Sequence, residues 1–142
     1  MADETETYDI AREVMNGTRD ALMCDNFDAF VRYFRLPQHM ETIEGKRLVE
    51  TKADLRQVFD AVRQYFVRTG ITGLDRELIR AEQKAPHLIE YLYETQMISE
   101  NTLFALPYPT FSMLCKTPDG WQIYYTMYGM MNADQHHAAL ID

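Results

Sequence analysis

The strongest constraint on the fold is a pair of aromatic-rich segments near the end of the chain, Tyr108 to Lys116 and Trp121 to Met130. Both are dense in Tyr, Phe, Ile, Thr and Met, which are typical of β-strands. They are joined by Thr117-Pro118-Asp119-Gly120, in which Pro fixes one turn dihedral and Gly accepts a positive φ. The sequence therefore predicts a β-hairpin, and the upstream chain has to supply the layer that packs against it.

Three helices are predicted upstream. The clearest begins at Thr51, a natural N-cap followed three residues later by Asp54 in a capping-box arrangement, and it ends at Gly70. Its apolar residues recur every three to four positions, as on the buried face of a helix. The same spacing indicates two earlier helices, Tyr8 to Met23 and Phe27 to Phe34.

The remaining elements are predicted to be strands. Gln38 to Ile43 and Lys46 to Glu50 form a short hairpin, the pattern after Gly73 alternates with period 2, and a further strand covers Leu88 to Met97. Helices gather at one end of the chain and strands at the other, without the alternation that a parallel sheet requires. The prediction is an α+β fold, in which three helices close a strongly curved antiparallel sheet.

Size and charge limit the partners. We expect one domain over residues 1–142, with flexible tails at 1–7 and 132–142. The net charge is -8, from 14 Lys and Arg against 22 Asp and Glu, so nucleic acids would be repelled. No apolar run approaches the roughly 20 residues that cross a bilayer, and we expect a cytoplasmic protein. Cys24 and Cys115 are expected to be buried free thiols.

The order of these elements resembles the nuclear transport factor 2-like superfamily, in its SnoaL-like, polyketide cyclase-like branch. The resemblance covers about Tyr8 to Met130 and includes the Leu36-Pro37 strand, the Glu44-Gly45 turn and the terminal Asp119-Gly120-Trp121-Gln122-Ile123. It implies an α+β cone around a pocket, and frequently a dimer through the outer sheet face. The superfamily includes isomerases, dehydratases, cyclases, epoxide hydrolases and non-catalytic proteins, so the reaction stays open.

The catalytic residues of one branch carry over poorly. Ketosteroid isomerases use a Tyr on the first helix and an Asp just beyond the second, and an alignment through Phe27-Asp28 puts Thr18 and Thr42 at those places. Threonine is not a base at neutral pH, so that mechanism is not expected. The neighbouring Gly17 is small, which would let another segment or a ligand approach the first helix closely.

Other titratable residues are weaker candidates. His39 is the candidate catalytic acid or base, because its strand is predicted to line the pocket mouth; the alternative is an ordinary polar strand residue. Glu90 and Glu94 share a face that we expect to be outside. His136 and His137 could hold a metal only if the tail folded back, so neither metal nor cofactor is expected.

The aromatic content predicts an apolar pocket. Nine Tyr, seven Phe and one Trp occur, and the expected ligand-binding residues are Phe30, Tyr33, Tyr91, Tyr93, Met113 and Tyr125. The alternative is that these rings only fill the cone. The predicted function is binding of a small apolar or aromatic molecule, with or without an isomerase, cyclase or hydratase step. The other hypothesis is a non-catalytic dimeric ligand-binding or protein-interaction module.

Three further expectations concern packing. Trp121 should be buried against the long helix near Val58 or Val62. The face of the sheet away from the helices should carry apolar residues and form a homodimer contact; the residues expected there are Leu88, Leu92 and Leu114. The irregular, apolar segment 98–107 should cover the pocket mouth or a partner subunit's.

Overall fold

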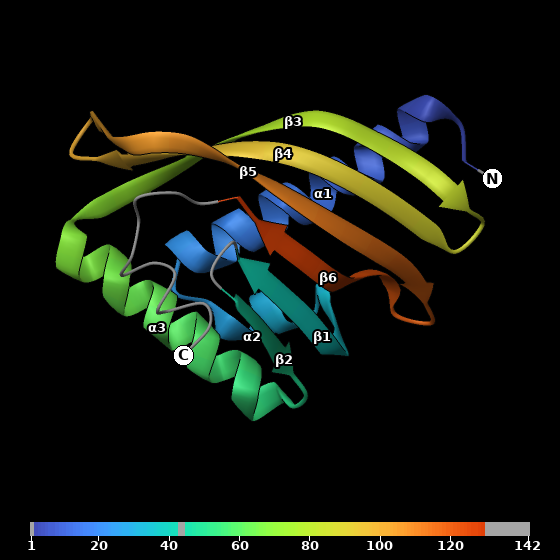
Figure 1. The fold of residues 1–142 in the computed structure, drawn as a ribbon, viewed down its shortest axis with the longest axis horizontal. Coiled ribbons are helices and arrows are strands. Elements are labelled where there is room, and N and C mark those ends of the chain that lie inside the picture. The colour runs from blue at the N-terminus through green and yellow to red at the C-terminus, as the bar shows by residue number, and fades with distance from the viewer. Residues whose placement is uncertain (1, 43–44, 130–142) are drawn as a thin grey trace.

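A bent six-stranded sheet with three helices packed against it forms the molecule (Figure 1). The computed structural model describes residues 2–42 and 45–129. The helices are α1 (Glu4–Met23), α2 (Phe27–Val31) and α3 (Lys52–Thr69). The strands are β1 (Phe34–Thr42), β2 (Gly45–Val49), β3 (Ile71–Ala85), β4 (Leu88–Ser99), β5 (Thr102–Thr117) and β6 (Gly120–Tyr128). Their order in the sheet is β2-β1-β6-β5-β4-β3. The α+β prediction is thus confirmed.

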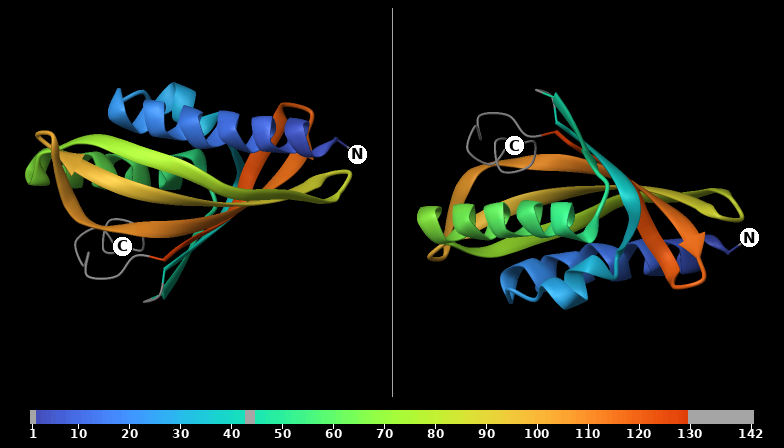
Figure 2. Two further views of the ribbon diagram at one scale, coloured as in Figure 1. Left: turned by 90° about the horizontal axis from the view of Figure 1, so that it is seen from above. Right: turned by 90° about the horizontal axis from the view of Figure 1, so that it is seen from below.

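The sheet is strongly curved, as predicted. Long strands β3, β4 and β5 form one wing, and β6, β1 and β2 turn away from it (Figure 2). Helix α1 lies along β3. One feature differs from expectation, because β1 pairs with β6 in parallel whereas every other pairing is antiparallel.

Helix α3 has the ends that its sequence predicts. The Thr51 hydroxyl accepts a hydrogen bond from the Asp54 amide at 3.1 Å, and the Asp54 carboxylate accepts one from the Thr51 amide at 3.1 Å. At the other end, Gly70 adopts the left-handed conformation with a φ of 74°, which glycine reaches without steric cost. Local signals therefore determine both boundaries.

The first two helices differ from the prediction at their ends. Helix α1 begins at Glu4 because Asp3 caps it, accepting a 2.8 Å hydrogen bond from the Glu6 amide, so most of the expected N-terminal tail is helical. Helix α2 ends at Val31, and β1 already runs through Leu36 and Pro37. The expected tail 132–142, including His136 and His137, lies outside the described residues.

The segment expected to be irregular is a hairpin. Glu100 and Asn101 form its turn with φ values of 50° and 65°, a conformation typical of two-residue hairpin loops. A bulge with Ala105 at a φ of 61° follows in β5. Phe104 packs against the core, but Leu103 and Leu106 are 73% and 77% exposed. The prediction that these leucines are covered is therefore not met within the described chain.

The two faces of the sheet separate the interior from the outside. Inward residues of neighbouring strands pair with one another, as do Ile89, Leu114 and Ile123 across β4, β5 and β6. Leu114 is 0% exposed, so its expected outward position is wrong. Leu88 and Leu92 pair with the outward Cys115 and Phe111.

Two single-residue expectations also fail. Cys24 follows the last residue of α1 and is exposed, whereas Cys115 is buried as expected. Trp121 is only half-buried, because it lies beside α1 at the rim of a groove. No helix in the described chain is both long and apolar enough to cross a membrane.

Candidate functional site

The inner face of the sheet is unusually polar. A sheet face that packs against helices is ordinarily apolar, yet buried polar side chains cluster on this one. We call them the polar strip: Gln38, Thr42, Thr95, Thr110, Ser112 and Thr126. They are nearly inaccessible to solvent, so the polarity belongs to the interior of the cone.

Strand register brings the strip together with a set of tyrosines. One row across the sheet reads Thr42, Tyr128, Thr110 and Tyr93. The next reads Met40, Thr126, Ser112 and Tyr91. A third row, towards the β4–β5 turn, reads Tyr108, Thr95 and Arg76. We call Tyr91, Tyr93, Tyr108 and Tyr128 the tyrosine cluster. In the first row, threonine hydroxyls alternate with phenol rings over four strands.

The hydrogen bonds of the strip are incomplete. Gln38 donates its amide to the Thr126 hydroxyl at 3.3 Å, and the Thr126 and Ser112 hydroxyls lie 3.4 Å apart. The Gln38 carbonyl oxygen and the Thr110 hydroxyl are buried without a partner among the described residues. An unsatisfied buried polar group costs about 1–3 kcal/mol. Such groups in a folded protein require an explanation.

The tyrosine cluster supplies rings and hydroxyl donors. Tyr91 and Tyr93 stack with ring centroids 5.7 Å apart. Burial raises the pKa of Tyr91, of Tyr108 and of Tyr128, while the nearby Arg76 guanidinium opposes part of each rise. These three phenols are therefore protonated at neutral pH, and their O–H groups can donate to an acceptor.

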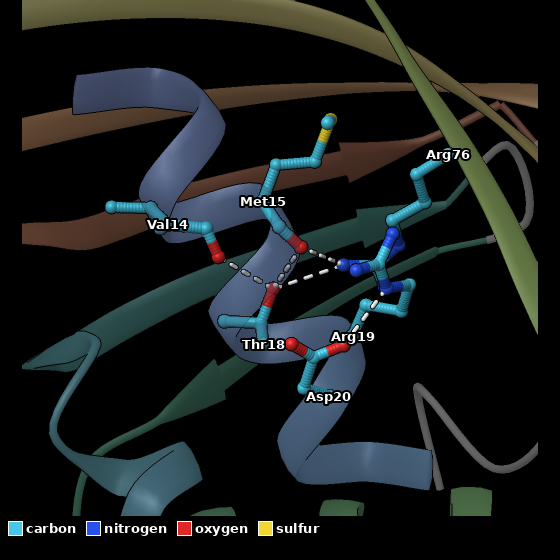
Figure 3. Close-up of polar contacts among 6 residues, drawn as sticks. All are labelled: Val14, Met15, Thr18, Arg19, Asp20 and Arg76. Carbon is cyan, nitrogen blue, oxygen red and sulfur yellow. Dashed lines mark hydrogen bonds and ion pairs between the residues drawn. The ribbon is translucent and has the colours of Figure 1, made fainter. Parts of the chain in front are cut away.

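Arg76 brings a positive charge to the same region (Figure 3). Its side chain extends from β3 towards α1, where Nη1 donates to the Met15 carbonyl and to the Thr18 hydroxyl, each at 2.9 Å. The guanidinium also lies over the Tyr93 ring, 5.0 Å from its centroid. Arg76 therefore connects the first helix to the tyrosine cluster.

The predicted ligand-binding residues do not share one surface. Tyr91 and Tyr93 lie on the inner face, and Phe30 is buried against Phe34 and Phe59 in the core. Met113 and Tyr125 pair with each other on the outer face. For Tyr125 a register shift explains this, because one extra residue in β6 reverses which of its side chains point inward. Strand β5 alternates regularly, and Met113 lies between the buried Ser112 and Leu114.

His39, the predicted catalytic residue, is also on the outer face. It is exposed and pairs with Tyr125 and Leu48. The closest polar contact in this area is between Tyr125 and Glu41, in which the phenol donates to the carboxylate at 2.5 Å. The pKa of Tyr125 is raised to about 12, mainly by this hydrogen bond and to a smaller extent by burial. Any catalytic role of His39 stays a prediction, and it would be separate from the polar strip.

Tyr33, the last predicted residue, lies in an external groove. The groove has a volume of about 620 Å³ and runs between α1, α2 and the β5–β6 turn. A Cβ atom on Gly17 would lie 2.1 Å from the Tyr33 hydroxyl, so the close approach expected at Gly17 is made by this side chain. Glu13, Asp20 and Asp119 line the groove and make it acidic.

Arg76 and the strip were missed at the sequence level. In β3, Arg76 has the same parity as Leu74 and Leu78, both of which point inward. A cation between two inward leucines is the signal that could have found it. Thr18 and Thr42 are both buried in the interior, where the resemblance places its catalytic positions.

Buried acidic residues and metal-binding groups are absent from the part of the chain that the structure describes. No Asp, Glu or His is buried in residues 2–42 and 45–129. Within the same residues, no group of three His, Cys, Asp or Glu side chains is arranged to hold a metal ion. The interior is therefore rich in hydrogen-bond donors and carries one guanidinium.

Comparisons with known proteins identify the fold. No protein-family profile and no curated protein matches the sequence. An NTF-2-like protein of unknown function from Shewanella oneidensis MR-1 superimposes with a TM-score of 0.68 at 10% identity, over 87% of this chain and 98% of that one. An NTF2-like protein with a cystatin-like fold from Novosphingobium aromaticivorans gives a TM-score of 0.69 at 11% identity, over 97% and 91%.

A cystatin-like domain of unknown function from Nostoc punctiforme matches at a TM-score of 0.68 and 15% identity, over 96% of this chain and 85% of that one. At such low identities the likeness concerns architecture, and the SnoaL-like branch stays a prediction. The chain therefore has the nuclear transport factor 2-like, cystatin-like fold that its sequence predicts.

Proposed function

We propose that the protein binds a small aromatic molecule on the inner face of the cone, against the polar strip and the tyrosine cluster. The observation that carries this proposal is the polar strip itself, with the unpartnered Thr110 hydroxyl and Gln38 carbonyl in a layer that should be apolar. A ligand that bonded to these groups would remove their desolvation cost. The stacked Tyr91 and Tyr93 rings would contact its aromatic body.

The chemistry of this face supports binding more than proton transfer. General acid–base catalysis works best with a group whose pKa is near the working pH. The Thr, Ser and Gln side chains of the strip do not titrate, and the raised pKa values of Tyr91, Tyr108 and Tyr128 keep these phenols protonated. The isomerase, cyclase or hydratase step would need a base from elsewhere, so the non-catalytic hypothesis is the one we propose.

A panel of phenol, indole, benzamide and benzoate tests the binding function. At least one compound should raise the melting temperature of the wild-type protein and of Trp121→Ala, which alters the external groove. The same compound should raise the melting temperature of Thr110→Val much less, because this variant lacks a hydroxyl of the polar strip. A melting-temperature shift that is lost in Trp121→Ala and kept in Thr110→Val would place the site in the groove and refute the proposal. The absence of a shift with every compound would refute it as well.

We also propose a homodimer through the outer face. Leu92, Phe111 and Met127 form an apolar row across β4, β5 and β6, and Met127 is 42% exposed. No described helix covers this row, since the helices pack on the opposite face. Apolar patches of this kind commonly mark association surfaces.

A further inference from the structure

We infer that the ligand of the inner face is an organic anion, an aromatic carboxylate whose charged group pairs with Arg76. The inference rests on the proposed function and specifies the class of molecule. It follows from the partners that Arg76 has, from those that it lacks, and from the chemistry around it.

Arg76 has only neutral partners. Its Nη1 donates hydrogen bonds to the Met15 carbonyl and to the Thr18 hydroxyl. Thr18 in turn donates to the Val14 carbonyl at 2.9 Å (Figure 3). Neither partner carries a negative charge, so these contacts orient the guanidinium without neutralising it.

Some other arginines in the described chain pair with carboxylates. Arg19, next to Thr18, pairs with Asp20 at 3.0 Å (Figure 3), and Arg56 pairs with Asp60 at 3.0 Å. Arg76 makes no ion pair with any described residue, although its side chain is half-buried. A charge shielded from water is costly unless it is paired. An external counter-ion would therefore stabilise the half-buried Arg76 guanidinium.

One edge of the Arg76 guanidinium fits a carboxylate. Its Nε is buried and has no hydrogen-bond partner among the described residues. In a guanidinium, the Nε–H and one N–H of Nη2 point the same way and match the two oxygens of a carboxylate. Because Nη1 makes the contacts with α1, this edge is not used for them. The anchored side chain therefore keeps its buried Nε–H, one donor of the carboxylate-binding edge, without a hydrogen-bond partner among the described residues.

The surroundings favour an anion over a cation. Tyr93 lies under the guanidinium at 5.0 Å, and the protonated Tyr108 and Tyr128 are close enough for Arg76 to affect their pKa values. Phenol O–H groups can donate to the same carboxylate. No described Asp, Glu or His is buried, so nothing there would compete for the guanidinium or attract a cation. The interior around Arg76 thus favours an anion, although the net charge of the whole chain is -8.

Isothermal titration calorimetry with three probes of the same size tests the inference. The probes are benzoate, its neutral analogue benzamide, and benzylammonium, measured at neutral pH. Benzoate should bind at least about tenfold more tightly than benzamide, and benzylammonium should bind most weakly. In Arg76→Gln the preference for benzoate should disappear while benzamide affinity changes little. Arg19→Gln is the matched control and should behave as the wild type, because Arg19 is paired with the Asp20 carboxylate.

The outcomes separate this inference from the proposed function. If benzamide binds the wild type as tightly as benzoate, the anion preference is wrong and inner-face binding stands. If neither probe binds the wild type, the proposed function fails together with the inference. The wild-type comparison does not need the variant, so it decides the question even if Arg76→Gln does not fold. A benzoate preference that persists in folded Arg76→Gln would assign the charge recognition to another residue and overturn the inference.

Discussion

Two threonines on the inner face have the same side chain and different hydrogen bonding. Thr110 has an unpartnered hydroxyl, whereas the Thr126 hydroxyl accepts from Gln38 and lies 3.4 Å from that of Ser112. Both residues are buried. If the Thr110 hydroxyl bonds to a ligand, it should be unsatisfied in the ligand-free protein and reduce the stability of that state.

Replacing each threonine by the isosteric valine tests this difference. Thr110→Val should raise the free energy of unfolding by about 1 kcal/mol, because it removes an unsatisfied buried group. Thr126→Val should lower it by about 1–2 kcal/mol, because the Gln38 amide loses its acceptor. Urea unfolding of the empty proteins measures both values. Equal losses in the two variants would show that the Thr110 hydroxyl is satisfied.

The Tyr125–Glu41 hydrogen bond predicts a pH dependence. The pKa of Tyr125 is raised from 10.0 to about 12, first by the hydrogen bond to Glu41 and then by burial. A raised pKa means that the folded state holds its proton more tightly. The stabilising contribution is therefore complete below pH 10 and is lost as pH rises towards 12. In Glu41→Gln, ultraviolet absorbance should show one tyrosine ionising at lower pH than in the wild type, and superimposable titration curves would contradict the assignment.

At the scale of elements, the sequence predicts best what local signals determine. Helix α3 has its cap at Thr51 and its stop at Gly70 within the segment itself, and both are confirmed. The inward and outward faces of β5 and β6 were assigned wrongly at Met113, Leu114 and Tyr125. In β6 a bulge decides the face of Tyr125, and in β5 the faces of Met113 and Leu114 depend on which side of the sheet the helices cover. Both depend on tertiary contacts, which no local pattern encodes.

The sequence can indicate that a residue contacts another element, but it does not identify the partner residue. The small Gly17 on α1 indicated a close approach, but the sequence did not show that Tyr33 makes it. In the same way, inward parity could have indicated Arg76, but its carbonyl partner at Met15 depends on how α1 crosses β3. The candidate site is therefore mostly a product of tertiary packing.

A double-mutant cycle tests the packing of the α2–β1 connection on α1. In a helix, Gly→Ala ordinarily stabilises by about 1 kcal/mol. In the wild type that gain should be lost at Gly17, because the new methyl group would meet Tyr33 at 2.1 Å. In a Tyr33→Ala background, Gly17→Ala should stabilise by about 1 kcal/mol. Chemical denaturation measures the coupling, and effects that add within about 0.3 kcal/mol would refute the contact.

At the scale of the whole molecule, the outer face predicts assembly. Light scattering should give about twice the 16.7 kDa of one chain. Phe111→Glu should produce monomers, because it puts a charge in the centre of the apolar row. Val67→Glu, at a residue of α3 that is 74% exposed, is the matched control and should leave the dimer intact. A wild-type mass of one chain at micromolar concentration would contradict the homodimer.

The central claim is that the polar interior of the cone is a binding site for an aromatic anion. Amide chemical-shift mapping during titration with benzoate tests it most directly, because it reports the place of binding residue by residue. The account predicts saturable shifts concentrated at Arg76, Tyr93, Tyr108, Thr110 and Thr126, which neighbouring strands bring together. Shifts confined to the groove around Tyr33 and Trp121, or to the outer face around His39 and Tyr125, would contradict it.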